Sequence, residues 1–406
     1  MARYFPRTLE PVLRRAAREF PVVMVTGPRQ SGKTTTLRRL FGRSHRYLSL
    51  ESPDVRASAE SDPRGLLDLL GPSAILDEVQ YAPDLLAYVK ERVDEDRGRA
   101  GQYLLTGSQS LTLHQRVTES LAGRAAVLRL LPLSRREMLR RPKALFPWDR
   151  NALADGRPVP PVADLWRSLL RGGYPELAAR PRRDAGLWHA SYVQTCLERD
   201  VRSLRQVGDL TQFQGFLRAL AARSGQLLNL SDLARDLGVA VNTAKAWLSV
   251  LEATDQVIVL RPYFANVGKR LVKTPKVYFA DTGTLCHVVG LRDPEHALAG
   301  PLAGALLETA VVAEVVRTLS HRGEQPQVYF WRTAAGTEVD LVVEAAGRLV
   351  PLEVKLSATP KPSMAAGIEA FRRDLGPRAA KGYVVHPGAQ ILPLGPDVVA
   401  LPFGLL

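Results

Sequence analysis

Residues 22–40, VVMVTGPRQSGKTTTLRRL, decide the fold of the first part of this 406-residue chain. The apolar residues 22–25 predict a buried strand, and helix-forming residues run from Thr34 to Leu40. The loop between them fits the pattern G-x-x-x-x-G-K-[ST] without a gap. Glycines let the backbone N–H groups of such a loop surround phosphates, and the dipole of the following helix favours negative charge. The stretch therefore predicts a strand, a phosphate-binding loop and a helix.

The loop predicts a site for ATP and Mg²⁺. We expect the Lys33 ammonium to reach the β- and γ-phosphates and the Thr34 hydroxyl to bind Mg²⁺. The residues expected to bind the nucleotide through this loop are Gly27, Pro28, Arg29, Gln30, Ser31, Gly32, Lys33, Thr34 and Thr35.

Two further predicted strands end in polar residues. In SAILDEVQ, residues 73–80, we expect Asp77 to hold Mg²⁺ through its water shell and Glu78 to polarise the attacking water. In GQYLLTGSQSL, residues 101–111, Ser108 is the candidate for sensing the γ-phosphate, and a plain turn is the alternative. The alternation of strands and helices predicts an α/β fold with a doubly wound parallel sheet.

Four segments together resemble a known family. The phosphate-binding loop, ILDEVQ, LLTGSQS and SLAGRAAVLRLLPLSRREM are similar to AAA+-type prokaryotic ATPases related to the STAND and origin-recognition lineages. The resemblance implies that Arg124 contacts the γ-phosphate, either in its own subunit or as a finger in trans; a purely structural arginine is the alternative. The strings GGYPE and Y-x-x-T-x-L-x-R-D match the same family, without indicating a chemical role.

Composition favours a polyanionic partner. The formal net charge is +14, from 55 Lys and Arg against 41 Asp and Glu, which suits DNA or another nucleic acid, although a lineage bias toward arginine explains it equally well. No apolar run approaches the roughly 20 residues of a membrane helix, so no membrane partner is expected. Two distant cysteines, Cys196 and Cys286, and the absence of a signal core favour the cytoplasm.

Residues 209–292 predict a winged helix-turn-helix, because three helical patterns precede two strand patterns joined by a basic turn. Its second motif helix would enter the major groove of DNA, and a wing would contact phosphates. A rigid coupler or protein contact is the alternative. The expected DNA-facing residues are Asn242, Thr243 and Lys245 on the helix, with Lys269, Arg270, Lys273 and Lys276 on or near the wing.

The strand RLVPLEVKLS, residues 348–357, carries Glu353 and Lys355 on one face. With Asp340 on the preceding strand and Glu308 on an upstream helix, the pattern is similar to the PD-(D/E)XK restriction-endonuclease-like superfamily. The resemblance implies that Asp340, Glu353 and Glu308 hold a divalent metal while Lys355 orients or deprotonates the attacking water. A surface hairpin with a solvated Glu–Lys pair is the alternative.

Together these patterns predict four parts: an AAA+-type ATPase domain over residues 1–145, a helical lid or spacer over 146–208, the winged helix over 209–292 and an α/β nuclease-like domain over 293–406. The order resembles bacterial and archaeal ATPases that carry a C-terminal domain of unknown function. We expect an Mg²⁺-dependent ATPase coupled to nucleic-acid binding and metal-dependent DNA cleavage. One alternative is a STAND-like, ATP-controlled switch whose C-terminal domain only binds a partner, and another is a degenerate DNA-binding module without nuclease chemistry. The sequence leaves the oligomeric state open.

Overall fold

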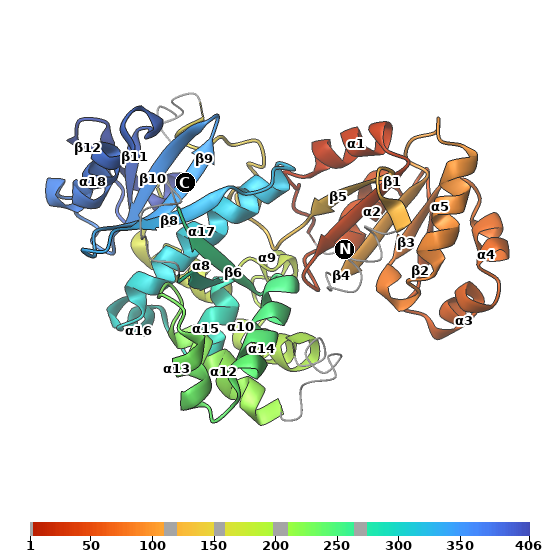
Figure 1. The fold of residues 1–406 in the computed structure, drawn as a ribbon, viewed down its shortest axis with the longest axis horizontal. Helices are drawn as coiled ribbons and strands as arrows, with labels where there is room; N and C mark the ends of the chain where they lie inside the picture. The colour runs from red at the N-terminus through yellow and green to blue at the C-terminus, as the bar shows by residue number, and fades with distance from the viewer. Residues whose placement is uncertain (1–2, 109–119, 150–158, 198–209, 264–273) are drawn as a thin grey trace.

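The computed structural model describes residues 3–108, 120–149, 159–197, 210–263 and 274–406. Figure 1 shows two sheets on opposite sides of the molecule, with helices between and below them. Among the described residues, no helix has the length and apolar character needed to cross a membrane.

The first sheet has five parallel strands in the order β2-β3-β4-β1-β5, which confirms the predicted α/β fold of this part. Because its strands are parallel, the sheet needs cover on both faces. Helices α1 and α2 pack on one face, and α4 and α5 pack on the other. The strands are β1 (Val22–Gly27), β2 (Arg46–Ser49), β3 (Ala74–Asp77), β4 (Tyr103–Ser108) and β5 (Ala125–Arg129). The helices are α1 (Glu10–Glu19), α2 (Lys33–Phe41), α3 (Pro53–Ser61), α4 (Pro63–Leu70), the short 3₁₀ helix η1 (Val79–Tyr81) and α5 (Leu85–Glu95).

The middle of the chain is helical, apart from one antiparallel hairpin formed by β6 and β7. Helix α8 packs against α15 and α16, so the predicted spacer rests on later helices. The elements are α7 (Arg135–Met138), α8 (Val162–Arg171), α9 (Pro175–Ala179), α10 (Ala185–Tyr192), the π-helical turn η3 (Val193–Leu197), α12 (Leu210–Ala222), α13 (Leu230–Asp236), α14 (Val241–Ala253), β6 (Val257–Pro262), β7 (Lys276–Phe279), α15 (Thr282–Val288) and α16 (Pro294–Ala299).

The second sheet has eight strands in the order β12-β13-β11-β10-β9-β8-β6-β7. The hairpin of the middle part therefore belongs to it, through the parallel pairs Arg261–Tyr329 and Pro262–Phe330 between β6 and β8. The remaining elements are α17 (Ala303–His321), β8 (Val328–Arg332), β9 (Glu338–Ala345), β10 (Arg348–Val354), η4 (Pro362–Ala365), α18 (Ala366–Leu375), η5 (Gly376–Arg378), β11 (Gly382–His386), β12 (Leu392–Gly395), β13 (Val398–Pro402) and η6 (Phe403–Leu405).

One hydrophobic core joins the middle and C-terminal parts. It runs from Leu131 to Leu406 and includes side chains of α8, α12, α14, α17 and the second sheet. The boundary expected between residues 292 and 293 lies inside this core. Helix α17 is buried along almost its whole length and lies between the second sheet and the first sheet (Figure 1).

Candidate nucleotide site and acidic cluster

The phosphate-binding loop follows β1, and its two glycines have backbone conformations that other residues rarely adopt. Gly27 has φ 142°, and a Cβ atom there would lie 2.1 Å from the carbonyl oxygen of Leu130. Gly32 has φ 95° and is the N-cap residue immediately before α2. Side chains at either position would therefore distort the loop.

Asp77 is the centre of a hydrogen-bond cluster at the end of β3. Its Oδ1 accepts hydrogen bonds from the hydroxyls of Thr34 at 2.6 Å and Thr106 at 2.5 Å, and its Oδ2 accepts one from Tyr47 at 2.9 Å. The structure thus brings Thr34 and Asp77 together, as the sequence predicted. A hydroxyl beside a carboxylate supplies oxygen ligands of the kind Mg²⁺ prefers, so this pair fits the ion.

Glu78 has a left-handed backbone, with φ 57°, directly after Asp77. Its N–H donates to Thr106 Oγ1 at 3.0 Å, and the Gln80 amide bonds both to the Glu78 carboxylate and, at 3.1 Å, to Ser108 Oγ. Ser108 and Glu78 are therefore joined through Gln80. Sequence reasoning missed Tyr47, Gln80 and Thr106. The strand period offered a signal for Thr106, because it lies two residues before Ser108 on the same face of β4.

Lys33 is turned back on its own loop. Its Nζ donates to the carbonyl oxygens of Gly27 at 3.0 Å and Pro28 at 2.9 Å. Burial lowers the pKa of Lys33 below its ordinary value. The remaining loop residues divide by exposure: Ser31 is buried, Arg29 is half-buried, and Gln30 and Thr35 are exposed.

The predicted C-terminal residues form an acidic cluster around Lys276. The Lys276 ammonium lies 3.0 Å from Glu308 Oε1 and 3.8 Å from Asp340 Oδ1, and it also pairs with Glu338. Tyr278 donates to the same Glu308 oxygen at 2.6 Å. Lys276 is only 4% exposed, so the prediction that it offers charge to DNA phosphates is wrong.

Glu353 and Lys355 lie beside this cluster. The Lys355 ammonium donates to Glu353 Oε1 at 2.6 Å, while the buried Glu353 Oε2 has no hydrogen-bond partner in the described part of the chain. Burial and the Asp340 carboxylate raise the pKa of Glu353 to about 8 and that of Glu308 to about 7. The cluster is therefore an unusually costly burial of negative charge.

As arranged, the cluster does not fit a divalent metal. Within the described ranges, no three His, Cys, Asp or Glu side chains are placed to hold one ion. The Lys276 ammonium supplies the cation between Glu308, Glu338 and Asp340 instead. Glu308, Asp340 and Glu353 therefore do not form the expected metal site in this arrangement, because Lys276 of strand β7 pairs with Glu308 and Asp340.

The residues expected to face DNA are only partly described. Asn242 and Lys245 are exposed on the first turns of α14, and Thr243 is half-buried. Lys269, Arg270 and Lys273 lie outside the described residues.

Comparison with known proteins gives these sites a context. Residues 19–139 match a family model described as an AAA domain, and residues 162–295 and 303–406 match two models described as domains of unknown function (DUF8612 and DUF4143). The chain is 35% identical, over 96% of its own length and 82% of theirs, to the uncharacterized proteins Mb2031c of Mycobacterium bovis and Rv2008c of Mycobacterium tuberculosis. The chain belongs to their family. Its first part is an AAA-type P-loop ATPase domain.

Solved structures are similar only in part. A Walker-type ATPase of Pyrococcus abyssi has a TM-score of 0.45 and 17% identity, over 69% of this chain and 94% of that chain. A STAND protein with a tetratricopeptide repeat sensor from Pyrococcus horikoshii has a TM-score of 0.27 and 12% identity, over 79% of this chain and 47% of that chain. Similarities of this size carry no argument about the arrangement of the later parts.

Arg124 lies at the wrong end of the AAA domain for a phosphate contact within its own subunit. It precedes β5, and its carbonyl accepts a hydrogen bond from Val22 at the start of β1, whereas the phosphate-binding loop follows the other end of β1. Its guanidinium forms two hydrogen bonds to Asp94, at 2.7 and 2.9 Å. The prediction of a contact in cis is therefore wrong, and the contact in trans stays a prediction.

A buried polar cluster connects the AAA domain to α17. Arg7 donates to the Ser31 carbonyl of the phosphate-binding loop at 2.9 Å and pairs with Glu137 at 3.1 Å. Glu137 faces His321 Nδ1 at 3.1 Å, and the Leu131 N–H donates to His321 Nε2 at 3.0 Å. Since Nε2 accepts this bond, His321 is neutral, which agrees with the lowering of its pKa by burial. The side chains of Glu137 and Arg7 thus connect His321, at the end of α17, to the phosphate-binding loop.

The string GGYPE lies at the same junction. A Cβ atom at Gly32 would be 3.7 Å from the ring of Pro175, so α9 begins over the phosphate-binding loop. The Gly173 N–H donates to Asp281 at 2.7 Å, and its carbonyl accepts from Leu133. Gly173 therefore joins the helical part to the strand-to-helix turn before α15.

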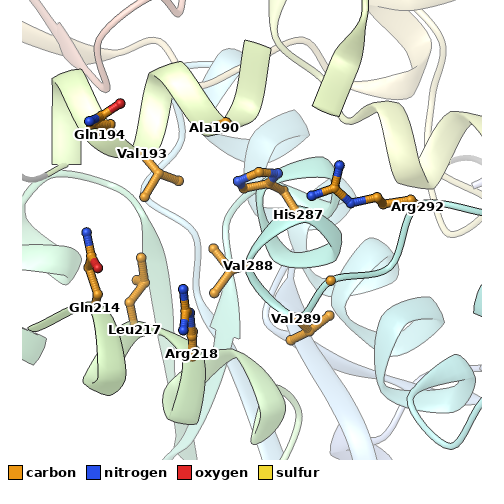
Figure 2. Close-up of a pocket in the computed structure, with 11 residues that line it drawn as sticks. Ala190, Val193, Gln194, Gln214, Leu217, Arg218, His287, Val288, Val289 and Arg292 are labelled. Carbon is orange, nitrogen blue, oxygen red and sulfur yellow. The ribbon is translucent and has the colours of Figure 1, made fainter. Parts of the chain in front are cut away.

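A surface pocket of about 460 Å³ lies away from both sites, between α10 and η3, α12, and the end of α15. Figure 2 shows Arg218, His287 and Arg292 among apolar residues such as Leu217 and Val288. Neither the nucleotide-binding residues nor the acidic cluster contribute to it, and it has no place in the predictions made from the sequence.

Proposed function

We propose that the chain hydrolyses ATP with Mg²⁺ and uses the turnover to act on bound DNA. The observation that carries the ATPase proposal is the cluster of Thr34, Asp77 and Thr106, with Glu78 beside it at the loop edge of the sheet. When bound, Mg²⁺ would neutralise phosphate charge between Thr34 and Asp77. In this proposal Glu78 orients the attacking water, and Lys33 leaves the Gly27 and Pro28 carbonyls to reach the phosphates.

Two variants test this proposal. Lys33→Ala should abolish ATP turnover by removing the charge that binds the phosphates, and Glu78→Gln should retain ATP binding while lowering kcat by roughly 100-fold or more. Phosphate release measures turnover, and a fluorescent ATP analogue measures binding. ATP turnover by Lys33→Ala at the wild-type rate contradicts the proposal.

DNA as the partner is supported by the net charge of +14 and by the exposed Asn242 and Lys245 on α14, in the helix–helix–helix–hairpin order of a winged helix. Binding should weaken steeply with salt. Lys245→Ala should weaken it uniformly across sequences, while Lys381→Ala, on the C-terminal unit, serves as a charge-matched control. Binding isotherms on duplex DNA that do not change with salt count against this role.

For the C-terminal unit, the geometry supports a metal-free, partner-binding role over cleavage, because Lys276 holds the cation position among the carboxylates. A cleavage assay with Mg²⁺ or Mn²⁺, ATP and a panel of DNA and RNA substrates tests this choice. Cleavage by wild type that is lost in Asp340→Asn would restore the nuclease role.

A further inference from the structure

Arg129 is a further arginine at the phosphate edge of the AAA domain, in addition to Arg7 and the loop residue Arg29. It is the last residue of β5, and its Cα pairs in register with Thr26, one residue before the loop glycine Gly27. The next residue, Leu130, brings its carbonyl oxygen so close to Gly27 that only a glycine fits there. No motif in the sequence singled out this arginine.

In this structure Arg129 is bound to the middle part of the chain. Its guanidinium pairs with Asp255, in the turn between α14 and β6. Asp255 is 2% exposed and has a left-handed backbone, with φ 58°. The pair therefore ties the start of β6, and through it the eight-stranded sheet, to the loop edge of the first sheet.

The pair is incompletely satisfied. Asp255 Oδ2 and Arg129 Nε are both buried, and neither has a hydrogen-bond partner among the residues that the structure describes. A buried carboxylate oxygen without a donor is costly. Asp255 is also within electrostatic reach of Lys33: burial raises the pKa of Asp255, while the charges of Arg129 and Lys33 lower it. A carboxylate thus lies where a triphosphate would bring strong negative charge.

We propose that Asp255 is a phosphate mimic that competes with the nucleotide for Arg129. Without nucleotide, Asp255 holds Arg129 and docks the middle part on the AAA domain. When the triphosphate binds at the loop, its charge repels Asp255, Arg129 turns to the phosphates, and the α14–β6 turn is released. This inference rests on the proposed ATP binding and adds a phosphate-binding residue and a route from the nucleotide to the DNA-facing helix.

The competition predicts opposite effects for the two partners. Asp255→Asn removes the competitor and should tighten binding of mant-ATPγS with Mg²⁺, and Arg129→Gln should weaken it, each by roughly tenfold, the factor that corresponds to about 1.4 kcal/mol. Glu252→Gln, at an exposed position of α14 three residues before Asp255, and Arg261→Gln, at an exposed position of β6, remove the same charges outside the pair and should stay within about twofold of wild type. Fluorescence anisotropy on the full chain gives each Kd.

Equal Kd values for wild type, Asp255→Asn and Arg129→Gln, or shifts in the same direction, overturn the competition. The ATPase proposal is tested separately, by comparing wild type with Lys33→Ala. If wild type binds no nucleotide, both the ATPase proposal and the competition are wrong. If wild type binds the nucleotide and Lys33→Ala does not, the ATPase proposal stands whatever the Asp255 and Arg129 variants show. A second measurement needs no variant: hydrogen exchange of peptides covering residues 250–262 should speed up when ATPγS binds wild type. Unchanged or slower exchange there also overturns the inference.

Discussion

At the scale of single residues, the nucleotide site depends on one hydroxyl that contacts two acidic residues. The Thr106 hydroxyl donates a hydrogen bond to the Asp77 carboxylate and accepts one from the backbone N–H of Glu78. It therefore positions both acidic residues at the end of β3. The strand pattern placed Ser108 there instead. Ser108 reaches Glu78 only through Gln80, which makes Thr106 the more direct positioning residue.

Thr106→Val should lower kcat for ATP hydrolysis by roughly tenfold while leaving the Kd for the nucleotide within about twofold, because the substitution keeps the shape but frees Asp77 and Glu78. Steady-state phosphate release and anisotropy separate the two quantities. Thr26→Val makes the same change on β1, where the hydroxyl contacts the Leu128 carbonyl at 3.4 Å, and serves as the control. If kcat falls equally in Thr106→Val and Thr26→Val, the loss comes from general destabilisation of the sheet and the prediction is wrong.

Glu353 makes the stability of the C-terminal unit depend on pH. Burial and Asp340 raise its pKa from an ordinary 4.5 to about 8. A raised carboxyl pKa means that the folded state binds the extra proton, so this stabilising contribution is complete below pH 4.5 and is lost as the pH rises through about 8. Stability should therefore fall over this window.

Glu353→Gln should remove that dependence. The variant should match wild type near pH 5 and be more stable by roughly 1–3 kcal/mol near pH 9. Urea unfolding at the two pH values measures the difference. Glu344→Gln, on an exposed position of β9, changes the same charge and should show no such divergence. Parallel pH profiles for wild type and Glu353→Gln contradict the prediction.

At the scale of elements, α17 is the part that reaches both candidate sites. Glu308 lies near its start, in the acidic cluster, and His321 ends it, beside Glu137 and the Arg7 that contacts the phosphate-binding loop. At about 1.5 Å per residue, the helix spans roughly 20 Å between these two side chains. No local pattern predicts this connection, because Glu137 and Arg7 are more than 100 residues from His321 in the chain.

Glu137→Gln should destabilise the protein by about 3–5 kcal/mol at pH 7, because it leaves the buried Arg7 without its counter-charge. Burial alone would raise the pKa of Glu137, but Arg7 and His321 hold it well below its ordinary value. The pair therefore stabilises the fold above the unfolded pKa near 4.5 and loses that contribution as the pH falls. The matched control is Glu91→Gln, since its partner Arg64 is exposed, and it should change stability by less than about 1 kcal/mol. Unfolding midpoints in urea compare the two variants.

At the scale of the whole molecule, three predicted parts share one core, and two of them, the middle and C-terminal parts, also share one sheet. Residues 131–406 contribute to that core, and β6 joins the hairpin of the middle part to β8. All five tryptophans lie in this region: Trp148, Trp166, Trp188, Trp247 and Trp331. Tryptophan fluorescence therefore reports on this unit and not on the AAA domain.

Urea unfolding followed by tryptophan fluorescence should show a single transition, since the helical, middle and C-terminal parts lose one common core. ATPγS with Mg²⁺ should shift the transition of the AAA domain, which circular dichroism follows together with the rest of the chain. Two separate fluorescence transitions would indicate that the parts unfold independently, as four separate domains would.

How much the sequence predicted depends on the range of the interactions involved. Residues 22–40 and the Asp77-Glu78 strand end predicted the parallel sheet and assigned Thr34 and Asp77 to the same Mg²⁺ site, because a strand, a loop and a helix in that order form local patterns. The same reasoning wrongly expected Arg124 near the γ-phosphate in its own subunit. Which edge of a sheet a residue lies at depends on strand direction and register, and these come from the tertiary structure. It also assigned Lys276 to DNA, because the letters of a basic strand do not show that it faces carboxylates.

Spacing along the chain was enough to predict the phosphate-binding loop with its strand and helix, and to place Glu353 and Lys355 on one face of β10. The tertiary structure was needed to show that Lys276 lies among the carboxylates of Glu308, Glu338 and Asp340, and that Arg129 pairs with Asp255. Both pairings join residues that are distant in the chain, through strand β7 in one sheet and strand β5 in the other. The free energy of burying charge depends on such neighbours, and no local period carries that information.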